Sequence, residues 1–141
     1  MSTENQIHLK GDFRREELYA AAAISPGDLV ELTSAGKAQV HSTAGGVAER
    51  LVAVEDALQG NTIDDDYAAD DLVSINIELP GNSVQMFLKA GENVAIGAKL
   101  ESAGDGTLQA VTTGEVVAVA EEAEDLSASG AVDTLIQVRL L

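Results

Sequence analysis

The stretch AGENVAIGAKLESAGDGTLQAV, residues 90–111, decides the fold, because an earlier part of the chain repeats its pattern. Residues 25–40 read SPGDLVELTSAGKAQV. In both stretches a Gly precedes an acidic residue, a Ser-Ala-Gly turn follows, and a Gln and a Val stand at the end. Glycine in such turns allows the backbone to take positive φ, as tight hairpins require. The pattern therefore predicts two similar β-hairpins.

The similarity extends beyond these hairpins and keeps its spacing. The segment LVAVEDA (51–57) corresponds to VVAVAEEA (116–123), and DDLVSINI (70–77) corresponds to DTLIQVRL (133–140). The matched Gly, Ala-Val and Asp positions are separated by 64, 65 and 63 residues. A spacing that holds through three segments is typical of an internal repeat.

Short apolar segments separated by Gly- and Pro-containing turns predict an all-β fold, a barrel or sandwich of short antiparallel strands, internally duplicated and with little helix. We expect a single β domain over residues 25–141, built from two related halves at about 25–79 and 90–141. Pro80-Gly81-Asn82 predicts a hairpin that joins strands at 72–79 and 83–88.

Residues 1–24 are expected to form an N-terminal arm. Within the arm, residues 13–24 fit either a short helix or a strand, and the sequence does not separate the two. Ile7, Leu9 and Phe13 make the arm more apolar than a solvated tail requires. An extended segment of this kind can add a strand to a neighbouring sheet.

The composition bounds the class of protein. A chain of 141 residues is long enough for one self-sufficient core, and it contains no Cys. The formal net charge of −16 argues against a nucleic-acid partner, because such proteins gather Lys and Arg on one face. No apolar run approaches the roughly 20 residues that span a bilayer, so we expect no membrane partner and no signal peptide.

The sequence offers little catalytic chemistry. His8 and His41 have no carboxylate or second His at ligand spacing, and no nucleophile-elbow or phosphate-loop motif is present. We therefore predict no enzymatic activity, no cofactor and no metal. The acidic loop around residues 64–71 could hold a cation through oxygen ligands, but its spacing does not match a calcium loop, and the question stays open. Its acidic residues are Asp64, Asp65, Asp66, Asp70 and Asp71.

One alternative comes from residues 91–100, GENVAIGAKL, which resemble a segment of biotinyl and lipoyl carrier domains. Those domains are also internally duplicated β-barrels, and they carry a modifiable Lys at a hairpin tip. Lys89 stands before the motif rather than at such a tip. A carrier-like barrel is therefore the second hypothesis.

Taken in order, PGDLVEL, TSAGKAQV, LVAVEDA, DDDYAADDLV and AGENVAIGAKLESAGDGTL resemble the capsid decoration, or head cement, proteins of tailed bacteriophages. The resemblance covers about residues 24–141. It implies small β-rich subunits, often homotrimers, made in the bacterial host cytoplasm and seated on the outer surface of the virion capsid. There they clamp neighbouring copies of the major capsid protein and stabilise the head.

The family's N-terminal arm commonly contributes to contact with the shell or a neighbouring subunit. By this resemblance, the candidate contact residues in the present chain are Ile7, Leu9, Phe13, Arg14 and Arg15.

Overall fold

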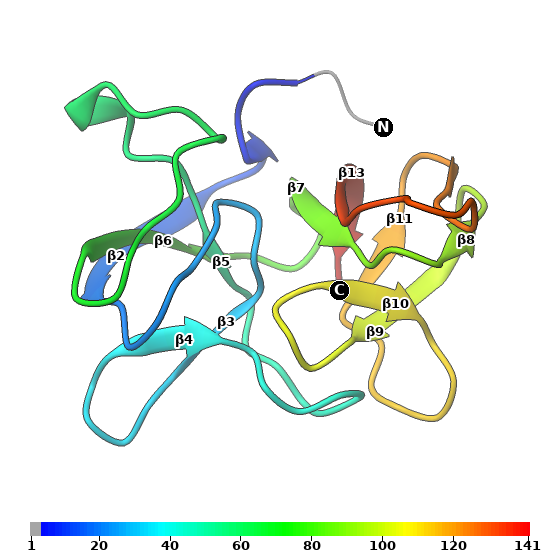
Figure 1. Cartoon of the computed structure of the whole chain (residues 1–141), viewed down its shortest axis with the longest axis horizontal. Coiled ribbons are helices and arrows are strands. Elements are labelled where there is room, and N and C mark those ends of the chain that lie inside the picture. The colour runs from blue at the N-terminus through cyan, green and yellow to red at the C-terminus, as the bar shows by residue number, and fades with distance from the viewer. Residues whose placement is uncertain (1–3) are drawn as a thin grey trace.

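A computed structural model describes residues 4–141 and shows two lobes side by side, built almost entirely of short strands (Figure 1). The strands are β1 (His8–Lys10), β2 (Phe13–Tyr19), β3 (Val30–Leu32), β4 (Ala38–Val40), β5 (Leu51–Ala53), β6 (Leu72–Glu78), β7 (Ser83–Leu88), β8 (Asn93–Val94), β9 (Lys99–Ser102), β10 (Leu108–Ala110), β11 (Ala118–Ala120), β12 (Glu124–Asp125) and β13 (Thr134–Leu140). A single 3-10 turn, Ala57–Gln59, is the helical element among the described residues. The all-β fold class predicted from the sequence is confirmed.

The C-terminal lobe is a closed ring of five strands in the order β7-β10-β9-β11-β13, and β13 returns to pair with β7. The β13–β7 ladder is antiparallel and runs from Thr134 opposite Leu88 to Arg139 opposite Ser83. A parallel pairing of Leu108 with Leu88 joins β10 to β7. Closure leaves this lobe with few open strand edges.

The N-terminal lobe has the same strand order, although parts of its ring are held by single bridges. β2, β6 and β5 form one sheet, and β3 and β4 form a hairpin. Leu29 bridges to Val52, which joins the hairpin to β5, and Ala20 bridges in parallel to Ala38, which joins β4 to the end of β2. The order β2-β4-β3-β5-β6 thus matches β7-β10-β9-β11-β13. We call residues 13–78 repeat 1 and residues 83–140 repeat 2.

Strand pairing gives residue-by-residue equivalence between the repeats. The bridge of Leu29 to Val52 corresponds to the pairing of Lys99 with Val119. By the same reasoning β5 corresponds to β11, with Ala53 equivalent to Ala120. The similarity of the two sequence segments instead matches Ala53 with Ala118, which is two residues earlier. A shift of two residues keeps every side chain on its face of the sheet, and for that reason the sequence pattern did not reveal it.

The repeat boundaries differ from the predicted ones because the first strand of each repeat lay outside the predicted halves. β2 was assigned to an N-terminal arm of residues 1–24, but it pairs along its whole length with β6. β7 was assigned to the connection between the halves. β2 reads FRREELY and is mostly exposed, so it lacks the alternating apolar pattern by which strands are recognised.

The predicted hairpin at Pro80-Gly81-Asn82 is also corrected. β6 already has β2 and β5 on its two edges, so no edge is free to pair with β7. The turn instead carries the chain from repeat 1 to repeat 2. Its backbone binds the end of β13, because Gly81 N–H donates to the Leu140 carbonyl at 2.8 Å and Leu140 N–H donates to the Asn82 carbonyl at 2.9 Å.

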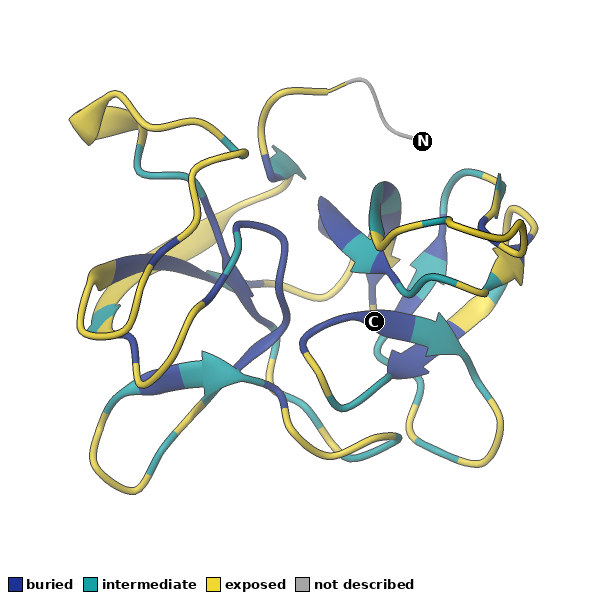
Figure 2. Ribbon diagram, in the orientation of Figure 1, coloured by how far each residue is buried: buried dark blue, intermediate teal, exposed yellow. Residues whose placement is uncertain are grey.

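The two repeats have separate hydrophobic cores, and the cores differ in which parts of the chain contribute residues to them. The core of repeat 1 draws only on residues 18–77 of the chain. The core of repeat 2 also takes in Ile7, Leu29, Val52 and Val54 from the N-terminal half. Figure 2 shows buried segments in both lobes, with most of the exposed strand surface in the N-terminal lobe. Repeat 2 is therefore sealed by repeat 1, and no residue of repeat 2 enters the core of repeat 1.

Candidate docking surface

The structure separates the five candidate contact residues. The Ile7 side chain is 0% exposed and lies in the core of repeat 2, so it is not available to a partner at the surface. Leu9 is half-buried on β1. Phe13, Arg14 and Arg15 are exposed on β2, where the Arg15 guanidinium lies 5.6 Å from the centre of the Phe13 ring.

A buried carboxylate, Glu78, anchors the segment that precedes β2. Its side chain accepts hydrogen bonds from His8 Nδ1 at 2.9 and 3.0 Å, from Asn82 Nδ2 at 2.7 Å and from Asn76 Nδ2 at 3.2 Å. His8 Nε2 also lies 2.7 Å from the Gly11 carbonyl, so a doubly protonated ring would donate to both acceptors. A buried carboxylate needs such partners. In the sequence, Glu78 stands in the polar positions of an alternating strand, residues 72–79, and nothing in that pattern signals its burial.

β2 is an open sheet edge along most of its length, up to its C-terminal end, where the next residue, Ala20, bridges to Ala38 of β4. Arg14, Glu16 and Leu18 direct their backbone groups to β6, in register with its residues 73, 75 and 77. The intervening residues turn their backbone N–H and C=O groups away from β6. Within residues 4–141, β2 pairs with β6 alone. The outward-facing residues are Phe13, Arg15, Glu17 and Tyr19.

The equivalent edge of repeat 2 is covered. β1 lies antiparallel to β7, with His8 opposite Val84. Gln85 N–H donates to the Ile7 carbonyl at 2.8 Å, and Phe87 N–H donates to the Gly27 carbonyl at 3.4 Å. The same position in the ring is thus occupied in repeat 2 and open in repeat 1.

A groove of about 290 Å³ lies beside the open edge. Its apolar walls include Leu18 on β2, Leu51 on β5 and Ile75 on β6, while Leu32 on the β3–β4 hairpin is 54% exposed. Arg14, Glu16 and Glu49 bring charged groups to it. An open strand edge beside an apolar groove is a surface suited to an extended segment of another chain.

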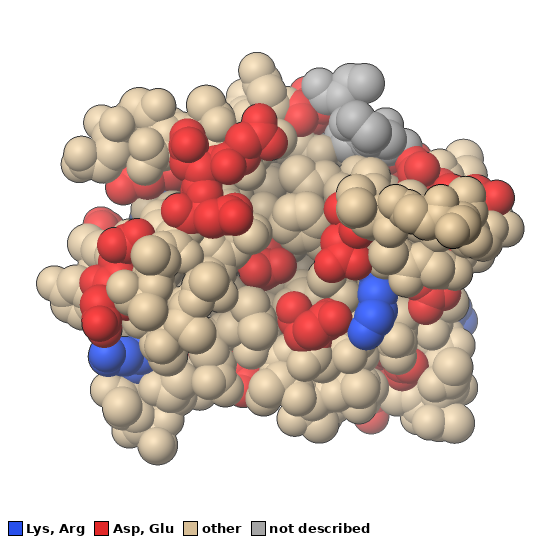
Figure 3. Space-filling view, in the orientation of Figure 1, with Lys and Arg blue, Asp and Glu red and all other residues tan. Residues whose placement is uncertain are grey.

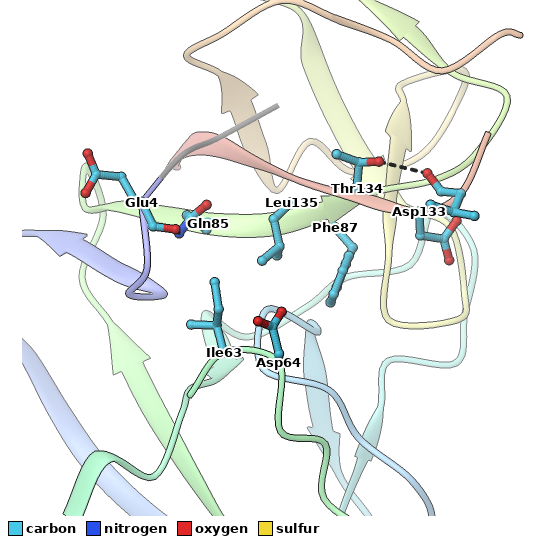
Figure 4. Close-up of a pocket in the computed structure, with 9 residues that line it drawn as sticks. Glu4, Ile63, Asp64, Gln85, Phe87, Asp133, Thr134 and Leu135 are labelled. Carbon is cyan, nitrogen blue, oxygen red and sulfur yellow. Dashed lines mark hydrogen bonds between the residues drawn. The ribbon is translucent and has the colours of Figure 1, made fainter. Parts of the chain in front are cut away.

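A second cavity, of about 300 Å³, lies between the two repeats (Figure 4). Its walls include Ile63, Phe87 and Leu135, and its polar lining includes Asp64 and Asp133. The figure shows these carboxylates on different segments, with no His beside them.

The molecular face between the repeats is acidic, with few basic side chains visible on it (Figure 3). Burial raises the pKa of Asp28 to about 7; a hydrogen bond from Ser25 N–H opposes the rise, and the nearby carboxylates of Asp66, Asp105 and Asp133 add to it. A carboxyl that is costly to ionise at this junction links the stability of the fold to pH.

The acidic loop uses its side chains to close its own turns. Asp65 Oδ2 accepts from Thr62 N–H at 2.7 Å, Asp71 Oδ2 accepts from Ala68 N–H at 2.8 Å, and Asp70 lies 2.8 Å from Lys37 Nζ. In the part of the chain that the structure describes, no three acidic, His or Cys side chains are grouped so that they could hold a metal ion. No helix within residues 4–141 is long and apolar enough to cross a membrane.

The lysines relevant to a carrier function lie in ion pairs. Lys37, at the β3–β4 turn, binds Asp70, and Lys89 Nζ lies 3.2 Å from Asp105 Oδ2. A carrier lysine has to project freely from a hairpin tip, and these two contacts do not favour that role.

The fold defines a class of tandem five-stranded β-rings, and comparison with known proteins adds one similarity. No protein-family model matches the chain. No curated protein sequence matches it either. Among solved structures, the N base of the head fiber protein gp8.5 of bacteriophage phi29 has the same fold, with a TM-score of 0.61 over 92% of this chain and 95% of that one. The two sequences are 14% identical, so the similarity concerns the fold.

Proposed function

We propose that this chain is a structural protein of a tailed-phage virion, which decorates the outer surface of the head and braces neighbouring major capsid subunits. The observation that carries the proposal is the match of nearly the whole chain to nearly the whole base of a phage head fiber. The order of turn and strand motifs, which resembles head decoration proteins, supports the same role from separate evidence.

The surface chemistry suits a brace rather than an enzyme. The polar groups are used to close turns and to fix the junction between repeats, as the contacts of Glu78 and Asp65 illustrate. The open edge of β2 and the groove beside it present a docking surface. Many weak contacts, repeated over a capsid, add up to a long residence time. We propose a non-enzymatic role on these grounds, with synthesis in the host cytoplasm before assembly.

Sedimentation with phage heads tests the proposal. Purified protein is mixed with expanded heads that lack decoration, and unexpanded heads serve as the control. We expect saturable co-sedimentation with expanded heads at a few copies per capsomer, because a decoration protein binds a surface lattice that expansion creates. Absence of binding at micromolar concentration would overturn the proposal. Intact-mass measurement of natively expressed protein separates the carrier hypothesis, which requires an adduct on Lys.

A further inference from the structure

The cavity between the two repeats combines apolar walls with acidic side chains. Leu135 and Phe87 of repeat 2 point across it toward Ile63 and Asp64 of repeat 1 (Figure 4). Its volume of about 300 Å³ is at the lower end of the range for ligand pockets, so it suits one side chain better than a large ligand. Among the described residues that line it, three are acidic and none is Lys, Arg or His.

A buried hydrogen-bond acceptor in the lining of this cavity has no donor. Gln85 lines the cavity and is 0% exposed. Its Nε2 lies 3.0 Å from the Glu4 carbonyl and 2.6 Å from the Gln6 carbonyl, and because carbonyl oxygens only accept, these contacts identify that atom as the nitrogen. The other amide atom, Oε1, is therefore an acceptor, and no described residue donates to it. Since buried acceptors are normally paired, this atom favours a ligand that brings a donor into the cavity.

The charge around the cavity favours a cationic donor. Asp64 and Asp133 are exposed, and Asp133 Oδ1 accepts from Ala90 N–H at 2.8 Å, which fixes one oxygen of a group that can accept several hydrogen bonds. Burial is the main cause of the raised pKa of Asp28 at the same junction, and neighbouring carboxylates, Asp133 among them, raise it further. The local potential is therefore negative, and it attracts a positively charged group.

An arginine side chain meets these requirements together. Its planar guanidinium is always charged and carries five N–H donors, so it can donate to a carboxylate and to an amide oxygen at the same time. Its aliphatic stem packs on apolar surface, and the guanidinium stacks on aromatic rings such as that of Phe87. The ammonium of a lysine matches the charge, but it has neither the planar fork nor the stacking surface.

We propose that the cavity between the repeats is a binding site for one arginine side chain of the capsid shell, whose guanidinium binds Asp64, Asp133 and Gln85 Oε1 while its stem packs against the apolar walls. The proposal rests on the proposed function, which supplies the shell as the partner. Because repeat 1 contributes Asp64 and repeat 2 contributes Asp133, the site exists only where the repeats meet. A shell repeats the contact many times, so each single contact can be weak.

A soluble arginine derivative tests the chemistry without phage heads. N-acetyl-arginine methylamide is titrated into the isotope-labelled full chain, and NMR follows the side-chain amide of Gln85 and the backbone amide of Leu135. The citrulline derivative is the matched control, because its urea group has the same shape without the charge. We expect saturable shifts at millimolar concentration of the arginine derivative, and binding about tenfold weaker or less with citrulline. Equal binding of the two derivatives, or no shift at these residues, would overturn the inference.

Neutral variants separate this site from the general acidity of the chain. Asp64→Asn removes a charge from the cavity and should weaken binding of the arginine derivative about tenfold. Asp66→Asn is the matched control, because Asp66 is exposed in the same loop and does not line the cavity. We expect binding by this control within about twofold of the unaltered chain, since exposed charges outside the site are screened by salt. Equal losses in the two variants would show that overall charge attracts the derivative, which contradicts the inference.

Co-sedimentation with expanded heads identifies the source of the arginine. The double variant D64N/D133N keeps an oxygen at position 133 that can accept from Ala90 N–H, so the local fold is retained. It should bind heads at least about tenfold more weakly than the unaltered chain, whereas Asp66→Asn should bind like the unaltered chain. Equal binding of heads by the double variant and the unaltered chain would overturn the shell as the source.

Two further outcomes distinguish this inference from the proposed function. Sedimentation velocity without heads should give the same association state for D64N/D133N and the unaltered chain. A change in that state would assign the arginine to another copy of this chain and overturn the inference. If the unaltered chain binds the arginine derivative but no heads, the decoration role fails and the chemistry of the cavity is supported. If it binds heads but not the derivative, the decoration role is supported and the inference fails.

Discussion

Repeats 1 and 2 have the same ring of five strands, but equivalent residues that point out of the ring are apolar in repeat 1 and charged in repeat 2. Leu29 of repeat 1 is 1% exposed and lies against repeat 2, whereas its equivalent, Lys99, is exposed to solvent. Val54 is buried at the junction, and the position equivalent to it is Glu121. Apolar residues thus fill the interior of both rings. The residues that point outward differ, and they determine that repeat 1 packs against the core of repeat 2.

The comparison also explains why the open edge lies in repeat 1. β1 precedes both repeats in the chain, and it pairs with β7 of repeat 2 rather than with β2 of repeat 1. Within residues 4–141, no strand pairs with the outer edge of β2. The ring of five strands is present twice, but a strand equivalent to β1 lies on one ring alone among the described residues. The outer edge of β2 is therefore left with backbone groups that can pair with another chain.

The largest expected effect breaks the seal between the repeats. Leu29→Ala should lower the free energy of unfolding by about 2–5 kcal/mol, because it removes a fully buried side chain from the core of repeat 2. Lys99→Ala, at the equivalent outward position, should change it by less than about 0.5 kcal/mol. Urea unfolding of both variants measures the difference. Similar values for the two would show that repeat 2 does not depend on repeat 1.

A smaller effect concerns Asp28, which faces the other carboxylates at the junction. Burial holds its pKa at about 7, above the value of 3.8 for a free carboxyl, so its contribution to stability is full below pH 4 and is lost as the pH rises to 7. Asp28→Asn keeps an oxygen that accepts from Ser25 N–H and cannot ionise. Relative to the unaltered chain, this variant should gain about 2–4 kcal/mol between pH 4 and pH 8.

Thermal or urea unfolding of both proteins at several pH values checks this prediction. The decisive quantity is the difference between the two proteins, since other carboxylates titrate in both. A difference that stays constant with pH would mean that Asp28 ionises freely in the folded protein.

The smallest effect compares the hairpin turns at equivalent positions. The pairings that close the two hairpins, Leu32 with Ala38 and Ser102 with Leu108, place Gly36 and Gly106 at the same position in their loops. Both glycines have positive φ, 78° and 86°, so an Ala at either position costs about 1–2 kcal/mol of backbone strain. A Cβ on Gly36 would meet open space, whereas one on Gly106 would lie 3.0 Å from Val40 Cβ and 3.1 Å from Asp28 Cγ. Gly106→Ala should therefore be less stable than Gly36→Ala by about 1–2 kcal/mol. Calorimetric unfolding of the two variants would refute this if their stabilities were equal.

Much of the fold could be predicted because turns and apolar alternation are local signals. The Ser-Ala-Gly turns and the apolar strand at residues 133–140 are enough to identify the hairpins and the repeat. The candidate site was less accessible. Ile7 looked like an exposed contact residue and is a core residue, whereas β2 was recognised only as a segment that fits helix and strand equally.

By itself, the sequence determined that this chain is an all-β, internally duplicated protein, because glycine turns and alternating side chains act over a few residues. The tertiary structure alone decided where each repeat begins, that residues 80–82 connect the rings instead of closing a hairpin, and that Glu78 is buried. Those outcomes depend on which strand edges are already occupied when others compete for them, and edge occupancy is a property of the assembled sheets rather than of any segment.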